Sequence, residues 1–267
     1  MSATLALRKF RPETMADDKV CVFIGKRGTG KSCLVTDILY HKRHLPSGIV
    51  MSATEEGNHH YKSFVPDIFI HSEYNREVLE KVLARQKTQL AKYDTMAQNA
   101  FILLDDCMYD KKFMKDSCIR MCFMNGRHWK LFFMLTMQYC MDLTPDLRAN
   151  VDYVFILREN VIQNREKLYK SFFGIFPTFQ MFNQVMDSCT ENYECLVLDN
   201  TSKSNKIQDC VFWYKAGLHK NFRVGSEAMW NFHKRNYNPN HEHEQNTNMN
   251  DPRNVKRNAS MTVVKKR

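Results

Sequence analysis

The fold of this chain is decided by eight consecutive residues, Gly25-Lys26-Arg27-Gly28-Thr29-Gly30-Lys31-Ser32 (GKRGTGKS). They match the phosphate-binding loop (P-loop) pattern G-x-x-x-x-G-K-[ST], in which backbone N–H groups surround phosphate oxygens. The context agrees, because an apolar run, 20–24, precedes the loop and a helical pattern follows it. Lys31 is expected to reach the β- and γ-phosphates of ATP, and the Ser32 hydroxyl to ligate Mg²⁺. The segment therefore predicts a nucleotide-binding α/β domain.

A second motif is the segment Phe101-Ile102-Leu103-Leu104-Asp105-Asp106, an apolar run that ends in two acids. Downstream of a phosphate-binding loop, we expect Asp105 to hold the magnesium through water. Asp106 is then expected to orient and deprotonate the attacking water. Two adjacent acids at this strand end are typical of the additional-strand ATPases, which couple hydrolysis to movement. The pair therefore predicts ATP hydrolysis rather than nucleotide binding alone.

A third apolar strand, 131–136, runs into Met137-Gln138. In the additional-strand architecture this strand inserts between the loop strand and the acidic strand, and a polar residue at its tip faces the γ-phosphate. Gln138 is therefore the expected sensor of that phosphate.

Arginines supply the last candidates, because ATPase rings commonly use an arginine of the neighbouring subunit to stabilise transition-state charge. Arg127, just before the Gln138 strand, and Arg148 are the two candidates, with Arg120 as a weaker third. Each is equally compatible with an ordinary surface arginine, so the choice stays open.

The pattern of apolar runs predicts an α/β fold with a mainly parallel sheet that helices flank on both faces. Strands are expected at 20–24, 48–53, 67–70, 101–104, 131–136, 151–157, 194–198 and 211–214. Helices are expected at 32–40, 75–93, 111–124 and, interrupted at Pro177, over 163–188. Residues 19–215 would form the ATPase domain, between an N-terminal arm, 1–18, and a C-terminal extension, 216–267. The extension is rich in Asn, His, Lys and Arg, and is expected to be disordered from about residue 236.

The composition indicates a polyanionic partner. The 267 residues include 39 Lys and Arg against 29 Asp and Glu, a net charge of +10, which favours nucleic acid ahead of a membrane surface. The nine cysteines lack the paired spacing of a disulfide framework, which predicts a reducing compartment. No stretch approaches the ~20 apolar residues that cross a bilayer, so we expect no transmembrane segment.

Together these motifs resemble the FtsK/HerA superfamily. The resemblance is carried by five segments: 25–32, 103–106, 136–138, Pro145-x-x-Arg148-Ala149-Asn150 and Val154-Phe155. Within that superfamily the chain looks like the virion DNA-packaging ATPases of large nucleocytoplasmic DNA viruses, the poxvirus-type packaging ATPase. Asn125-Gly126-Arg127-His128, ahead of the Gln138 strand, strengthens the likeness. Specific motifs cover about residues 19–160, and a looser likeness continues to about residue 215.

The resemblance implies a RecA-like additional-strand core that assembles into a homo-oligomeric ring. It also implies ATP-driven, sequence-independent translocation of double-stranded DNA into a preformed capsid, in the virion and the cytoplasm of an infected cell. A helicase or conjugation-type pump of the same superfamily shares these motifs. A P-loop switch or scaffold without motor activity is the alternative from a different class, although it has no need of a hydrolytic base. Candidate DNA contacts are His41–His44, Lys111–Lys112 and the basic tail.

Overall fold

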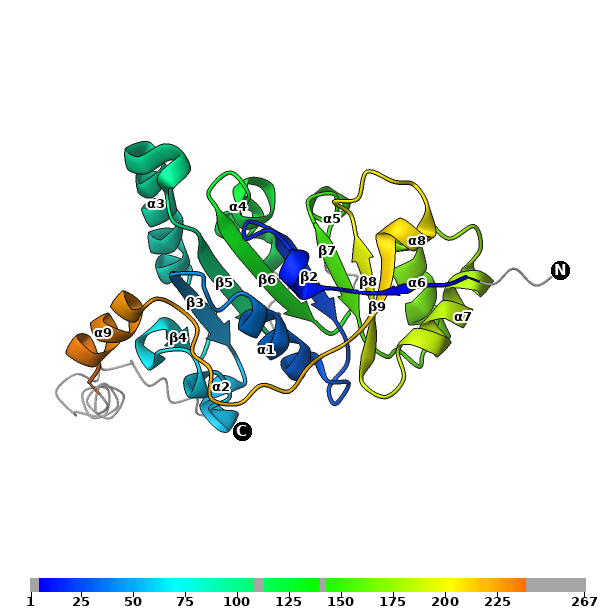
Figure 1. Cartoon of the computed structure of the whole chain (residues 1–267), viewed down its shortest axis with the longest axis horizontal. Coiled ribbons are helices and arrows are strands. Elements are labelled where there is room, and N and C mark those ends of the chain that lie inside the picture. The colour runs from blue at the N-terminus through cyan, green and yellow to red at the C-terminus, as the bar shows by residue number, and fades with distance from the viewer. Residues whose placement is uncertain (1–4, 108–112, 140–142, 239–267) are drawn as a thin grey trace, which may run out of the picture.

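The computed structural model describes residues 5–107, 113–139 and 143–238, and a nine-stranded sheet forms its centre (Figure 1). The strands are β1 (Arg8–Lys9), β2 (Val20–Ile24), β3 (Ser47–Ser52), β4 (Ile70–His71), β5 (Ala100–Asp105), β6 (Leu131–Met137), β7 (Tyr153–Ile156), β8 (Glu194–Asp199) and β9 (Val211–Lys215). Their order in the sheet is β1-β9-β8-β7-β2-β6-β5-β3-β4.

Helices connect and cover these strands. They are α1 (Lys31–His41), α2 (Glu55–Asn58), α3 (Arg76–Tyr93), α4 (Ser117–Asn125), α5 (Pro145–Arg148), α6 (Ile162–Phe172), α7 (Phe179–Cys189), α8 (Ile207–Cys210) and α9 (Glu227–Asn236). None of the helices in the described ranges is long and apolar enough to cross a membrane.

The topology confirms the predicted additional-strand arrangement. Strand β6 pairs in parallel with β2 on one side and with β5 on the other, so it separates the loop strand from the acidic strand. Most neighbouring pairs are parallel, whereas β8 runs antiparallel to both β7 and β9. In a parallel sheet the carboxyl ends of the strands meet at one edge, which brings the residues that follow β2, β5 and β6 together.

Two apolar clusters lie on opposite faces of the sheet, because successive side chains of a strand point to opposite sides. Val20, Val22 and Ile24 of β2 belong to the cluster that also contains residues of α3, α4, α5, α6 and α7. Cys21 and Phe23 of the same strand belong to the second cluster, with residues of α1 and of the C-terminal segment. Helices therefore flank both faces, as the sequence predicts.

The described part of the C-terminal segment packs on the domain. After β9 the chain crosses in front of α1 and then forms α9 (Figure 1, orange). Val224 is fully buried and Met229 is 5% exposed, both in the cluster on the α1 side of the sheet. The His219 ring hydrogen-bonds to the buried carboxylate of Asp37 in α1 at 2.5 Å. Strand β1, from the N-terminal arm, pairs with β9 at the sheet edge.

Two local predictions were wrong. Residues 67–70 were expected as a strand, but Asp67–Phe69 form a 3-10 turn after Pro66, and β4 begins only at Ile70, which pairs with Val50. The helix expected over 111–124 begins at Ser117, because the side chain of Asp116 accepts a hydrogen bond from the Cys118 N–H at 2.8 Å and caps it. Lys111–Lys112 and the tail beyond Asn238 lie outside the described residues.

Candidate functional site

The phosphate-binding loop joins β2 to α1 at the carboxyl edge of the sheet. Gly28 has φ 79° and Gly30 has φ 96°, in the left-handed region where a side chain is strained, so glycine is required at both positions. Helix α1 begins at Lys31, and its N-terminal N–H groups and partial positive charge favour an anion in the loop. The Gly25 N–H donates to the Met137 carbonyl at 3.1 Å, which ties the loop to the end of β6.

A partly buried ion pair holds the loop on the β7 side. Lys26 Nζ lies 2.6 Å from Glu159 Oε1, and the Glu159 side chain is 8% exposed. Burial by itself raises the pKa of Glu159, but hydrogen bonds from Lys26, the Val161 N–H and Asn164 outweigh it, so the pKa lies below its usual value. Glu159 therefore stays ionised and anchors the loop to the segment after β7.

Asp105 ends β5 and is 4% exposed, yet its carboxylate is well supplied with donors. Oδ2 accepts hydrogen bonds from Tyr61 Oη at 2.8 Å and Ser52 Oγ at 3.2 Å, and Oδ1 accepts one from Thr136 Oγ1 at 2.7 Å. Burial and the Asp105 charge raise the pKa of Tyr61 well above its usual value, so the phenol stays a donor. Three hydroxyl groups thus stabilise the buried carboxyl group, which forms no ion pair with any residue that the structure describes.

The same carboxylate suits magnesium held through water. Its two oxygens offer about four acceptor positions, and the three hydroxyls leave room for one water of a hydrated ion. The Ser32 hydroxyl, at the start of α1, lies on an exposed residue. Hard oxygen donors of this kind are those that Mg²⁺ prefers, so the residues fit the ion.

Asp106 and Gln138 come together beside this carboxylate. Asp106 has φ 54°, and its N–H donates to Thr136 Oγ1 at 2.9 Å. Gln138 Nε2 donates to Asp106 Oδ1 at 3.2 Å. The Thr136 hydroxyl accepts from Asp106 and donates to Asp105, so one side chain sets the positions of both acids. The structure thus gathers the loop, both acids and Gln138 at one edge of the sheet.

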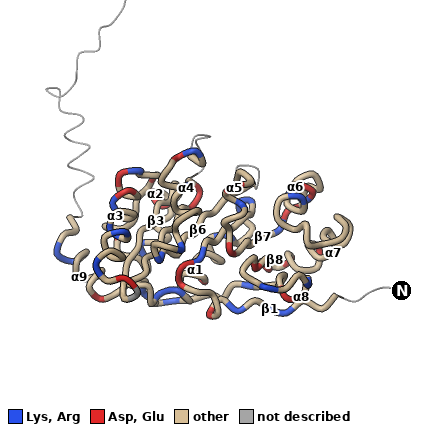
Figure 2. The backbone as a smooth tube through the Cα atoms, turned by 90° about the horizontal axis from the view of Figure 1, so that it is seen from above, with Lys and Arg blue, Asp and Glu red and all other residues tan. Residues whose placement is uncertain are grey.

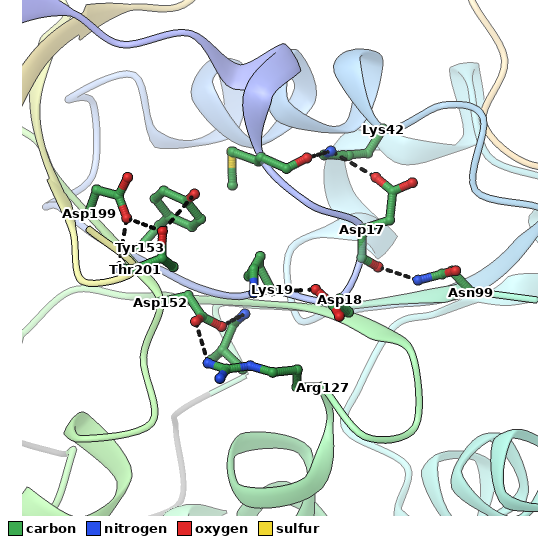
Figure 3. A network of polar contacts seen from close by, with 12 residues as sticks. Asp17, Asp18, Lys19, Lys42, Asn99, Arg127, Asp152, Tyr153, Asp199 and Thr201 are labelled. Atoms are coloured by element: carbon green, nitrogen blue, oxygen red, sulfur yellow. Dashed lines mark hydrogen bonds and ion pairs between the residues drawn. The ribbon is translucent and has the colours of Figure 1, made fainter. Parts of the chain in front are cut away.

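Arg127 lies beside Asp152 (Figure 3), ahead of the amino end of β6, whereas the loop lies at the carboxyl ends of the strands. Its Nη2 is 2.6 Å from Oδ1 of Asp152, whose Oδ2 accepts the Val20 N–H at 2.9 Å, at the start of β2. Strand β6 spans seven residues, so about 20 Å separates its two ends. The structure therefore does not bring Arg127 to the loop of its own chain, and an action on a neighbouring subunit stays a prediction.

The other two arginines also have partners away from the loop. Arg148 Nη1 donates to the Leu143 carbonyl at 3.2 Å and to Ser171 Oγ at 3.5 Å. Arg120 Nη2 lies 2.5 Å from Asp146 Oδ2. Neither contact joins the arginine to the loop or to the acidic pair.

Sequence reasoning missed a group of residues on the β7 side of the loop. Arg158, Thr190, Asn192 and Tyr193 line a cavity of 190 Å³ together with Gly28 and Thr29. Arg158 follows the carboxyl end of β7, which pairs with β2. Because ligands bind at the carboxyl ends of such strands, this position in the sequence could have indicated a ligand contact. Asn192 and Tyr193 lie in a turn that gave no such signal. The loop and the residues lining this cavity belong to one site.

Comparison with known proteins identifies relatives in large DNA viruses. The sequence profile of a family described as Poxvirus A32 protein matches residues 8–213. An uncharacterized protein of Acanthamoeba polyphaga mimivirus is 41% identical over 241 residues, covering 87% of this chain and 84% of the relative. An uncharacterized protein of Frog virus 3 is 38% identical over 214 residues, covering 79% of this chain and 66% of that relative.

Solved structures confirm the fold. The DNA-packaging ATPase from Sulfolobus turreted icosahedral virus has a TM-score of 0.55 at 18% identity, covering 77% of this chain and all (100%) of that one. The genome packaging NTPase of Sulfolobus turreted icosahedral virus 2, in complex with ATP-gammaS, has a TM-score of 0.52 at 17% identity, covering 76% and 100%. The nine-stranded, mostly parallel sheet with flanking helices is thus that of the P-loop packaging ATPases.

Proposed function

Because the chain belongs to the family described as Poxvirus A32 protein, we propose that it is an ATP-driven motor that moves double-stranded viral DNA into the capsid. The observation that carries the proposal is the contact of Gln138 with Asp106 beside the loop, since it joins a phosphate sensor to a hydrolytic base. Structural neighbours described as genome packaging NTPases, in complexes with AMP, AMPPCP and ATP-gammaS, support nucleotide binding.

Each residue of the site has one task in this proposal. The loop N–H groups and Lys31 bind the β- and γ-phosphates, and Ser32 with Asp105 would hold Mg²⁺. The ion neutralises phosphate charge when it is bound. Asp106 accepts the proton of the attacking water. The Gln138 amide, which donates to Asp106 here, would exchange that partner for the γ-phosphate and so report whether ATP is present.

Arg127 is the proposed arginine that acts across a subunit interface in a ring of identical chains. Its side chain is 57% exposed, and the 3% exposed Asp152 holds it in place. From this end of the sheet the side chain can reach a nucleotide only in a neighbouring subunit. Arg148 and Arg120 are the less favoured choices, because both residues are only partly exposed.

DNA binding in this proposal uses the excess of positive charge. Figure 2 shows Lys and Arg spread over many elements and mixed with Asp and Glu, rather than gathered on one element. Phosphate contacts of this dispersed kind give affinity without reading sequence, as a motor that must pass every sequence requires. The candidate contact His41–His44 lies at the end of α1 away from the loop, and within it Lys42 is 2% exposed and pairs with Asp17, so the exposed Arg43 and His44 remain the candidates. The capsid is the other partner, and the virion and infected-cell cytoplasm are the proposed location.

The test is the ATPase rate with and without double-stranded DNA of arbitrary sequence. A motor predicts a several-fold stimulation by DNA that does not depend on sequence. An ATPase rate that DNA does not change, together with tight retention of nucleotide, would contradict the proposal and favour a nucleotide-dependent switch.

The matched variant is Asp106→Asn, which preserves shape and removes the base. We expect it to bind ATP and to lose turnover by about 10²-fold or more, because general-base catalysis contributes about 10²–10⁴. Turnover that survives this substitution would show that Asp106 is not the base.

A further inference from the structure

The cavity on the β7 side of the loop lies where a nucleotide must continue beyond its phosphates. Asp105, Asp106 and Gln138 follow β5 and β6, on one side of β2, and these residues define the γ-phosphate end. The 190 Å³ cavity lies on the other side, toward β7 and β8, and two of its lining residues, Gly28 and Thr29, belong to the loop. A nucleotide with its phosphates in the loop therefore directs its nucleoside toward this cavity.

A second cavity adjoins the first and has room for the rest of a nucleoside. Its volume is 450 Å³, and it shares Arg158, Thr190 and Asn192 with the smaller one. That volume is within the range of about 300–1,000 Å³ found for small-molecule sites. Asn160 and Glu191, both exposed, supply further polar groups to its wall.

Tyr193 is held over the loop at a conformational cost. Asn192 (φ 50°) and Tyr193 (φ 63°) are the two central residues of a turn that the Glu194 N–H closes on the Glu191 carbonyl at 2.9 Å. Turns with two positive φ angles favour Asn or Gly, whereas a bulky side chain there is a true outlier. Such outliers cluster at ligand sites.

The Tyr193 ring packs against the loop and yet remains largely exposed to solvent. A Cβ added to Gly30 would lie 3.2 Å from Tyr193 Cδ1, so glycine lets the ring reach the loop backbone. The residue is nevertheless 69% exposed. An aromatic ring placed beside a phosphate loop, with most of its surface open, is suited to stack on a flat ligand.

Arg158 is the charged group of the same cavity. It makes no hydrogen bond or ion pair with any residue in the described ranges, unlike Arg120, Arg127 and Arg148. A guanidinium offers five donors and a planar face, which suit ring nitrogens, ribose oxygens and the face of a base.

We propose that these cavities form the nucleoside pocket of the site, in which Tyr193 stacks on the base and Arg158 binds the base or ribose. The inference rests on the proposed function, because it requires nucleotide in the loop. It assigns to the turn between α7 and β8 a role in nucleoside binding, separate from hydrolysis by Asp106.

The experiment compares two ligands that differ only in the nucleoside, Mg-ATP and Mg-tripolyphosphate, by titration calorimetry on the full chain. Tyr193→Asn keeps a residue that tolerates positive φ and removes the ring. We expect it to raise the Kd of ATP about tenfold, as loss of one base stack does, and to leave the Kd of tripolyphosphate unchanged. Tyr193→Phe keeps the ring and should bind ATP as the parent chain does.

Arg158→Ala should weaken ATP several-fold, again without an effect on tripolyphosphate. Equal weakening of both ligands would make Arg158 a phosphate ligand and overturn its assignment. Tyr93→Asn is the matched control, since Tyr93 is 45% exposed at the end of α3, outside the cavity, and should change neither Kd.

An unchanged ATP affinity in Tyr193→Asn would overturn the pocket while leaving the proposed function intact. Failure of the parent chain to bind either ligand would instead overturn the proposed function.

Discussion

At the scale of single residues, the acidic pair depends on the hydroxyl of Thr136. This hydroxyl donates to Asp105 at 2.7 Å and accepts from the Asp106 N–H at 2.9 Å, and Thr136 itself is fully buried. Its position in β6 opposite Phe23 of β2 is fixed by the parallel register of the sheet. The two acids are therefore positioned by the inserted strand as well as by their own.

Thr136→Val keeps the shape of the side chain and removes the hydroxyl. The Asp106 N–H then loses its acceptor and Asp105 loses a donor, which should lower the free energy of unfolding by about 1–3 kcal/mol. Turnover should fall as well, because no single hydroxyl then holds both acids in position. Thr136→Ser, which keeps the hydroxyl, should retain turnover. Thermal unfolding and steady-state ATPase rates measure both effects, and a fully active Thr136→Val chain would contradict this role.

The sequence was informative about Asp105, Asp106 and Gln138 because each follows an apolar strand directly, and strand order places strand ends together. Tyr193 could not be predicted from the sequence, for a physical reason. Tyr193 reaches the loop through a turn between α7 and β8, far from the loop in the sequence, and such tertiary contacts leave no local pattern. The arginine candidates near the Gln138 strand were chosen by sequence distance, which does not reveal that Arg127, ahead of the amino end of β6, pairs with Asp152.

At the scale of elements, the ion pair between Lys26 and Glu159 links the loop to the connection between β7 and α6. The folded-state pKa of Glu159 lies below its unfolded value of about 4.5. Its stabilising contribution is therefore complete above about pH 4.5 and is lost as the pH falls through the folded pKa.

Glu159→Gln tests the contribution of this ion pair through the pH dependence of the free energy of unfolding. The parent chain should lose more stability than the variant between about pH 5 and about pH 3, because only the parent takes up a proton at this position. At neutral pH the variant should be the less stable chain, since Lys26 loses its charged partner. Urea unfolding across this pH range gives the comparison, and parallel profiles would contradict the assignment.

The strand and helix pattern of 19–215 was predictable because strong apolar periodicity marks each element. The segment after β9 was not, since residues 216–226 contain few apolar positions and neither helical nor strand periodicity. Its packing depends on single side chains, Val224 and Met229, that fit the α1 side of the core.

Truncation measures what this segment contributes. A chain that ends at residue 215 lacks the buried side chains of Val224 and Met229, and the burial of each contributes about 1.5–3 kcal/mol to the free energy of unfolding. It also leaves the buried Asp37 without His219. Because a whole domain has only about 5–15 kcal/mol of stability, we expect this chain to unfold at much lower temperature or to be insoluble. A chain that ends at residue 238 serves as the control and should melt like the full chain. Equal melting temperatures for all three would contradict a structural role for 216–236.

At the scale of the whole molecule, two opposite edges of one sheet carry complementary parts. The loop, the acids and Gln138 lie at the edge formed by the carboxyl ends of the parallel strands. Arg127 lies at the edge formed by their amino ends, where it forms an ion pair with Asp152. In a ring where Arg127 of one chain completes the nucleotide site of the next, the amino edge of one sheet would face the carboxyl edge of its neighbour. Mixing parent subunits with Arg127→Ala subunits should then reduce ATPase activity more than in proportion to the fraction added, whereas a cis or structural role predicts a proportional loss.

Displacement of a third strand from a DNA triplex measures whether hydrolysis drives movement along DNA. We expect the protein with ATP to displace the strand whatever the duplex sequence leading to it, and Asp106→Asn, which still binds ATP, to displace none. Active hydrolysis in the presence of duplex DNA without displacement of the third strand would contradict this expectation.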